Sequence, residues 1–84
     1  GADPAEIGLM RSTTEGMNVA MMGLAWRPGD EVITTQLEHI CLFSLLGLLS
    51  HRHGVTIRTV DIGSGGGDVL GALAAAVTPR TRAI

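Results

Sequence analysis

Two apolar runs constrain how this chain can fold. Residues 16–26 and 40–49 carry no charged side chain, in a sequence of only 84 residues. Each run is about eleven residues long, whereas a helix needs about 20 apolar residues to cross a bilayer. We therefore expect two buried helices and no membrane span. A helix that is apolar on all sides belongs in the core of a larger protein, so we expect residues 1–84 to be a partial domain, truncated at both ends.

The pattern of apolar and turn-forming residues predicts alternating strands and helices. Gly54 stands where a left-handed helix cap belongs, and Asp68 is a favourable N-cap. We expect strands and helices in turn, over residues 6–11, 12–26, 31–35, 38–53, 55–62 and 69–77, with a last strand beginning at 83–84. The order βαβαβαβ is typical of an α/β fold, a parallel sheet between helical layers in a three-layer αβα arrangement.

Two segments have the spacing of a capping box. Ser12 and Glu15 are three residues apart at the start of the first expected helix, and Thr35 and Glu38 repeat the spacing before the second. In such a box the hydroxyl and the carboxylate each accept a hydrogen bond from a free backbone N–H. The pattern predicts where both helices begin.

The first helix start has the donors that a phosphate dianion needs. Backbone N–H groups are unpaired there, the helix dipole is positive, and Ser12, Thr13 and Thr14 add hydroxyls. The carboxyl ends of parallel strands, where these residues are expected, are also where open sheets bind ligands. The alternative is an ordinary helix cap, which such strings usually form.

His39 follows the second expected strand after a short link. If the strands are parallel neighbours, His39 lies near Thr13 and Thr14 at the same sheet edge. An imidazole can stack on a flat heteroaromatic ring and can carry protons near neutral pH. The alternative is a polar residue of the first helical turn with no chemical role.

Four segments in order resemble the class V aminotransferases, the pyridoxal-phosphate enzymes that include isopenicillin N epimerases and cysteine desulfurases. They are Thr14-Glu15-Gly16-Met17-Asn18, Pro28-Gly29-Asp30-Glu31-Val32, Glu38-His39 and Thr78-Pro79-Arg80-Thr81-Arg82. The resemblance covers nearly the whole chain, and the ordered combination is more specific than any single segment. The approach Trp26-Arg27-Pro28 is most similar to the epimerase branch.

The resemblance implies part of the cofactor-binding large domain of a fold-type I pyridoxal-phosphate enzyme. It implies that Thr13 and Thr14 bind the cofactor phosphate and that His39 faces the pyridine ring. It also implies an amino acid substrate and a homodimeric, cytoplasmic parent enzyme. The family's Schiff-base lysine has no counterpart, because all six basic residues are arginines. We therefore expect the parent to be an enzyme, and residues 1–84 alone to be inactive.

Other function classes find little support. A net charge of −2 and two aromatic residues offer neither a basic surface nor a stacking platform for nucleic acid. One cysteine excludes an internal disulfide and fits a reducing compartment. Residues 63–67 lack the third glycine of a dinucleotide-binding loop, because Asp68 stands there.

Metal and thiol chemistry are also disfavoured. On a helix, His39 and Cys41 diverge, as do His51 and His53, because neighbours on one face are three or four residues apart. We therefore expect no metal site, a solvated helix end at 51–53, and Cys41 as a small apolar residue inside a helix. Two alternatives remain open: a non-catalytic α/β module that binds a phosphorylated metabolite or nucleotide, and a truncated fragment without function.

Overall fold

Strand β1 (Glu31–Thr35) organises the fold. It is the middle strand of a parallel sheet with the order β2-β1-β3. The computed structural model describes residues 1–63 and 67–84. Besides β1, its elements are the 3₁₀ turn η1 (Pro4–Glu6), helices α1 (Thr13–Met22), α2 (Ile40–His53) and α3 (Val69–Ala76), and strands β2 (Thr56–Val60) and β3 (Thr81–Ala83). The expectation of a parallel α/β fold is confirmed.

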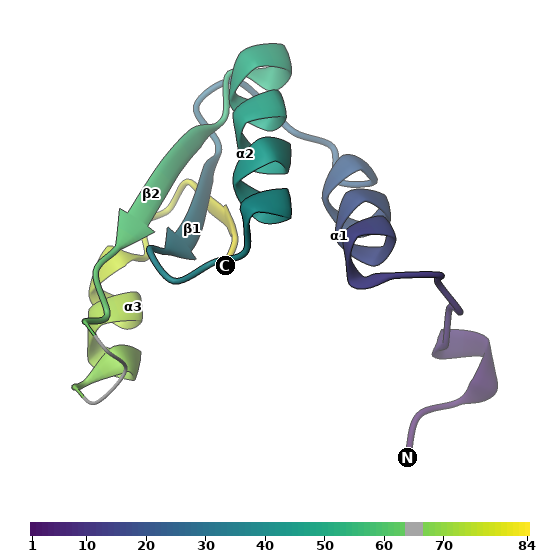
Figure 1. The fold of residues 1–84 in the computed structure, drawn as a ribbon. Coiled ribbons are helices and arrows are strands. Elements are labelled where there is room, and N and C mark those ends of the chain that lie inside the picture. The colour runs from purple at the N-terminus through teal and green to yellow at the C-terminus, as the bar shows by residue number, and fades with distance from the viewer. Residues whose placement is uncertain (64–66) are drawn as a thin grey trace.

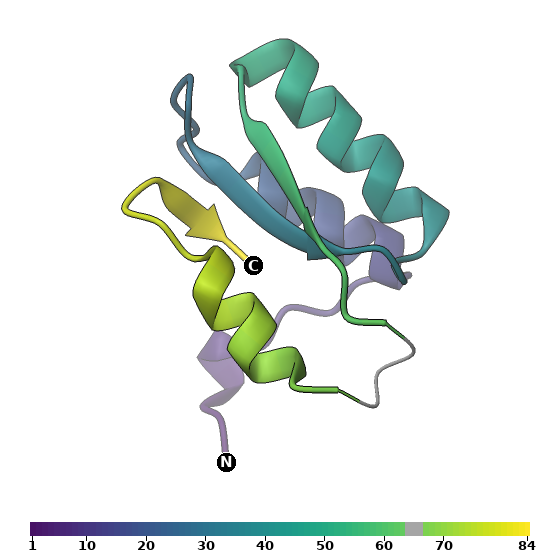
Figure 2. The same ribbon diagram turned by 90° about the vertical axis from the view of Figure 1, so that its left-hand side faces the viewer.

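The sheet separates two helical layers. Helices α1 and α2 lie on one face, with α1 outermost, and α3 lies on the other (Figure 1, Figure 2). The chain moves one way from β1 to β2 and then back across β1 to β3. Right-handed crossovers in opposite directions put their helices on opposite faces, so the strand order accounts for the three layers.

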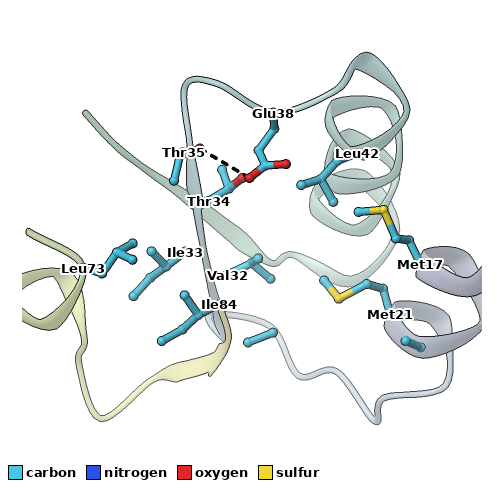
Figure 3. A pocket seen from close by; sticks show the side chains of 12 residues that line it. Met17, Met21, Val32, Ile33, Thr34, Thr35, Glu38, Leu42, Leu73 and Ile84 are labelled. Carbon is cyan, nitrogen blue, oxygen red and sulfur yellow. Dashed lines mark hydrogen bonds between the residues drawn. The ribbon is translucent and has the colours of Figure 1, made fainter. Parts of the chain in front are cut away.

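The core lies between β1 and α2. Val32, Leu46, Leu49 and Val55 form a cluster in which no side chain is more than 3% exposed. Trp26 and four other partly buried apolar residues pack against it. Alternate residues of β1 face opposite layers, so Val32 turns toward α2 while Ile33 lies beside Leu73 of α3 (Figure 3). The sheet is thus anchored on both faces.

A buried carboxylate joins the strands at their amino ends. Glu31 is 1% exposed, and its Oε2 accepts a hydrogen bond of 2.7 Å from the Thr78 hydroxyl. The Arg80 guanidinium donates to Oε1 at 2.9 Å, and Arg58 of β2 lies 3.5 Å from Oε2. One side chain of β1 therefore holds both neighbouring strands, and these contacts were not anticipated from the sequence.

The expected strand over residues 6–11 is wrong. Residues 4–6 form the 3₁₀ turn, which is capped by Asp3, and residues 7–11 have no regular structure. Ile7 and Leu9 are 58% and 93% exposed. Strand propensity is expressed only where a neighbour supplies hydrogen bonds and packing, and no described strand pairs with this segment.

The first helix is also shorter and less buried than expected. It ends at Met22 rather than near Trp26, whose indole N–H donates to the Met21 carbonyl at 2.6 Å. This bond satisfies a carbonyl of the last turn and directs the chain into the core. No residue of α1 is buried, whereas α2 buries Leu45, Leu46 and Leu49. The expectation of a helix buried on all sides is therefore wrong for α1 and holds for only one face of α2, where Ile40 and Phe43 stay 69% and 37% exposed.

The remaining elements differ from expectation only at their ends. Helix α2 begins at Ile40 rather than residue 38, and strand β2 covers 56–60 within the expected 55–62. Helix α3 ends one residue early, at Ala76, and β3 is Thr81–Ala83 rather than a start at 83. Asp68 caps α3 as expected, with its carboxylate accepting from the Gly71 N–H at 2.8 Å.

Gly54 gives a direct test of the α2–β2 turn. It has a φ of 67°, in the left-handed region, and a Cβ placed there would lie 3.4 Å from two atoms of Pro28. We expect Gly54→Ala to lower the free energy of unfolding by about 1–2 kcal/mol, because L-residues disfavour this conformation. Urea denaturation followed by Trp26 fluorescence measures the change. Gly47→Ala, at an exposed helical position with open space around its Cα, is the control and should be neutral or stabilising.

Candidate functional site

Helix α1 begins with a cap that is only half of the expected capping box. The Ser12 hydroxyl accepts a hydrogen bond from the Glu15 N–H at 3.2 Å. The Glu15 carboxylate does not return to Ser12 but binds the Arg11 N–H at 2.6 Å and the Arg11 guanidinium at 3.0 Å. These hydrogen bonds from Arg11 lower the pKa of Glu15. The Glu15 carboxylate is therefore paired with Arg11, the residue that precedes the Ser12 cap.

The start of α1 retains two free donors. The hydroxyl and carbonyl of Ser12 accept from the N–H groups of Glu15 and Gly16. The N–H groups of Thr13 and Thr14, which come before these, meet no acceptor in the described part of the chain. Each of these threonines also carries a hydroxyl. Unpaired N–H groups at the positive end of a helix dipole are suited to an anion.

Helix α2 is capped by His39, not by the expected box of Thr35 and Glu38. The Thr35 hydroxyl contacts the Glu38 carboxylate at 3.3 Å and accepts from the Leu37 N–H. His39 is the N-cap, and its Nδ1 accepts a hydrogen bond from the Cys41 N–H at 3.3 Å. The side chains of the loop after β1 thus bind groups within the same loop. The imidazole caps α2 in place of the hydroxyl or carboxylate that usually caps a helix.

The expectation that His39 and Cys41 diverge is wrong. Their Nδ1 and Sγ atoms are 3.1 Å apart. The spacing rule applies between residues that both lie within a helix, but His39 precedes α2 and its side chain bends over the first turn. Cys41 lies in that turn, half-buried and free of any disulfide, rather than deep inside the helix.

A hollow of about 390 Å³ brings the expected site residues together. Seven residues line it, and they come from the starts of the two helices: Thr13, Thr14, Met17, Glu38, His39, Cys41 and Leu42. The cause differs from the one expected. Thr13 and Thr14 follow no strand, and they reach His39 because α1 packs against α2.

A second hollow, of about 430 Å³, adjoins the first and shares Met17, Glu38 and Leu42 with it. It lies beside β1, between Leu73 on one face of the sheet and Met21 on the other (Figure 3). Its lining is apolar apart from two threonines and Glu38. Glu38 lines both hollows, so what distinguishes the first hollow is the start of α1 with its unpaired N–H groups. The hollow with the free helix N–H groups is therefore the better candidate for a phosphorylated ligand.

Gln36 fixes the loop that carries His39, and sequence reasoning missed it. Its side-chain amide donates to the Asp61 carboxylate at 2.6 Å and accepts from the Ile62 N–H at 3.0 Å. These bonds join the loop after β1 to the loop after β2. A polar residue directly after a strand is a weak signal, because its partners lie about 25 residues further along the chain.

The described residues contain neither a helix that could span a membrane nor a cluster of metal ligands. Over residues 1–63 and 67–84, no helix has the length and apolar character that a bilayer crossing requires. The same ranges contain no group of three or more metal-ligating side chains. The glycine-rich segment lies partly outside the described residues, since these omit 64–66.

The family model of class V aminotransferases matches residues 1–84. The chain belongs to the class V aminotransferase family. A probable cysteine desulfurase from Pseudomonas aeruginosa is 36% identical over 62 residues, which cover 71% of this chain and 16% of that protein. The resemblance inferred from the four sequence segments is thus confirmed.

Two solved structures share the fold of this chain over the matched residues. A mutant of C-DES with glycine covalently linked to its PLP cofactor matches with a TM-score of 0.76 and 30% identity, over 82% of this chain and 18% of that one. A complex of the cystine C-S lyase C-DES with its product, cysteine persulfide, matches with a TM-score of 0.75 and 32% identity, over 83% and 19%. The chain spans under a fifth of the length of these relatives. The comparisons support the expected fold-type I architecture and pyridoxal phosphate as the cofactor.

Proposed function

We propose that this chain supplies part of the cofactor site of a pyridoxal-phosphate enzyme that acts on an amino acid. The observation that carries the proposal is the hollow where Thr13, Thr14 and His39 meet. Its donors fit a phosphate dianion, because two residues at a helix start each offer an unpaired backbone N–H and carry a hydroxyl. When bound, the cofactor supplies an electron sink for reactions of amino acids.

In this proposal the residues divide their tasks. Thr13 and Thr14 bind the phosphate through their N–H and hydroxyl groups, and the dipole of α1 adds to the attraction. His39 lies across the flat ring of the cofactor and orients it. Glu38 also lines the hollow, and Thr35 holds its carboxylate at 3.3 Å, so we place the phosphate on the α1 side.

The substrate class follows from the relatives. The Pseudomonas aeruginosa relative is described as a probable cysteine desulfurase, and C-DES as a cystine C-S lyase. We therefore propose a cysteine-type amino acid and cleavage at a carbon–sulfur bond. The epimerase reading of Trp26-Arg27-Pro28 is the competing assignment. Incubation of the whole protein with cysteine or cystine separates the two, because cleavage releases sulfur whereas epimerisation changes only the configuration.

Assembly and location complete the proposal. We propose that the whole protein is a homodimer in the cytoplasm. Cys41 is a free cysteine, which fits a reducing compartment. Size-exclusion chromatography with light scattering, over a range of concentrations, tests the dimer; a monomer at all concentrations would remove that part of the proposal.

A phosphate-site test uses single hydroxyl deletions. We expect Thr13→Val and Thr14→Val each to weaken pyridoxal-phosphate binding by about tenfold or more, because hydrogen bonds to charged groups contribute about 1.5–3 kcal/mol. Absorbance titration of the whole protein with pyridoxal phosphate measures the affinity. The control is Thr56→Val, the same change at the opposite edge of the sheet, where Thr56 pairs with Glu31.

Three results bear on the proposal. Weakening at positions 13 and 14 with a neutral control supports it. Equal affinities in all variants, or no binding by the wild-type protein, overturn it. The non-catalytic module is favoured instead if nucleotides or sugar phosphates bind as tightly as pyridoxal phosphate.

A further inference from the structure

The contact between His39 and Cys41 determines where the imidazole carries its proton. Two groups of Cys41 contact Nδ1 of His39. The backbone nitrogen of Cys41 lies 3.3 Å from Nδ1, and its Sγ lies 3.1 Å from Nδ1. The backbone N–H can only donate, so Nδ1 must offer its lone pair. An imidazole that accepts at Nδ1 has its proton on Nε2 when it is neutral.

The thiol reinforces the same state. A proton on Nδ1 would face the Cys41 N–H and would leave that helix donor without its cap. With Nδ1 unprotonated, the thiol can donate its own proton to the lone pair, whereas a thiolate would be repelled by it. The capping bond and the S–H bond therefore favour one tautomer of His39.

We propose that Cys41 is a positioning residue for His39: its N–H and thiol hold Nδ1 as an acceptor, so the ring presents a protonated Nε2 and a fixed orientation in the hollow. The significance of this orientation for the cofactor rests on the proposed function. The protonation state itself does not, because it follows from contacts within the first turn of α2.

The experiment reads the tautomer directly. Nitrogen-15 spectra of histidine-labelled whole protein, recorded at mildly alkaline pH, distinguish the protonated ring nitrogen from the other; His39→Gln identifies the His39 signals. We expect Nε2 to be protonated in the wild type. In Cys41→Ala, which keeps the N–H and loses the thiol, we expect the tautomer ratio to shift about threefold to tenfold toward Nδ1–H. Cys41→Ser should restore the wild-type ratio, because a hydroxyl can also donate.

The control is Ser44→Ala, which removes a polar group from the same helix. The Ser44 hydroxyl binds the Ile40 carbonyl at 3.2 Å rather than the imidazole, so its loss should leave the tautomer unchanged. Circular dichroism should show equal helix content in all variants. A wild-type imidazole protonated on Nδ1, or a Cys41→Ala ratio equal to that of Ser44→Ala, would overturn the proposal.

A parallel titration with pyridoxal phosphate separates this proposal from the proposed function. If the wild-type protein binds no pyridoxal phosphate but the tautomer responds as expected, the cofactor assignment fails and the positioning role stands. If pyridoxal phosphate binds and the tautomer does not respond, the positioning role alone fails.

Discussion

Replacing Leu49 with alanine is expected to lower the free energy of unfolding by about 2–5 kcal/mol. Leu49 is fully buried, and it packs in the cluster with Val32, Leu46 and Val55 between α2 and the sheet. Removal of three carbon atoms loses transfer free energy and leaves a cavity that tightly packed neighbours cannot fill. Urea denaturation monitored by Trp26 fluorescence measures the loss, since Trp26 packs against the same cluster.

Leu70→Ala provides the matched control. It removes the same atoms from a helical leucine of α3 that is 80% exposed. Surface substitutions usually stay within about 0.5 kcal/mol of the wild type. Comparable losses at positions 49 and 70 would contradict the placement of the core between α2 and β1.

Elements with a strong local signal could be predicted from the sequence. Strand β1 has the expected bounds, and Gly54 and Asp68 cap their helices as expected. In each case the information lies within a few residues: β-branched side chains for the strand, a glycine at positive φ, and a carboxylate at a helix start. The segment at 7–11 differs because a strand needs a neighbour, and no described strand supplies one.

The proximity of the proposed site residues was predicted from the sequence, but the cause of that proximity was not. Thr13, Thr14 and His39 line one hollow, as expected, although the packing of α1 on α2 replaces the neighbouring strands that the prediction assumed. Cys41 was missed because a helix rule was applied to His39, which precedes the helix. Sequence spacing alone could not show that the imidazole caps α2.

The contacts of Glu31 with Thr78, Arg80 and Arg58 were beyond sequence reasoning, because they join residues up to 49 positions apart. They have a consequence for pH. The hydrogen bond from the Thr78 hydroxyl, followed by that from Arg80 and the charges of both arginines, lowers the pKa of Glu31 against the opposing effect of burial. The ionised carboxylate is thus favoured in the folded protein more than in the unfolded chain.

The sign of the pH effect follows from this difference. Because the pKa is lower in the folded state, the unfolded chain takes up the proton first as the pH falls. The stabilisation from Glu31 is therefore fully present above the ordinary glutamate pKa, about 4.3, and is lost as the pH falls through the lowered value. We expect the urea midpoint of the wild type to decline through this acidic range.

Glu31→Gln is expected to lower the urea midpoint at neutral pH and to flatten its decline in acid. The amide keeps the size of the side chain and can still accept from Thr78, but it carries no charge to oppose Arg58 of β2 and Arg80, which directly precedes β3. Removing one charge from a buried ion pair lowers the free energy of unfolding more than the same change in an exposed pair does. Denaturation series of both proteins between pH 3 and pH 7 measure the two effects together.

Glu15→Gln is the control for this prediction, because it makes the same chemical change in an exposed pair. The Arg11 side chain is 92% exposed and that of Glu15 is 33% exposed, and they are one helical turn apart. Solvent weakens such pairs, so many contribute little. We expect Glu15→Gln to change the neutral-pH midpoint much less than Glu31→Gln. If the two variants lose equal stability, or if Glu31→Gln keeps the full acid dependence of the wild type, then the contacts of Glu31 do not hold the three strands together, and another group must account for the acid sensitivity.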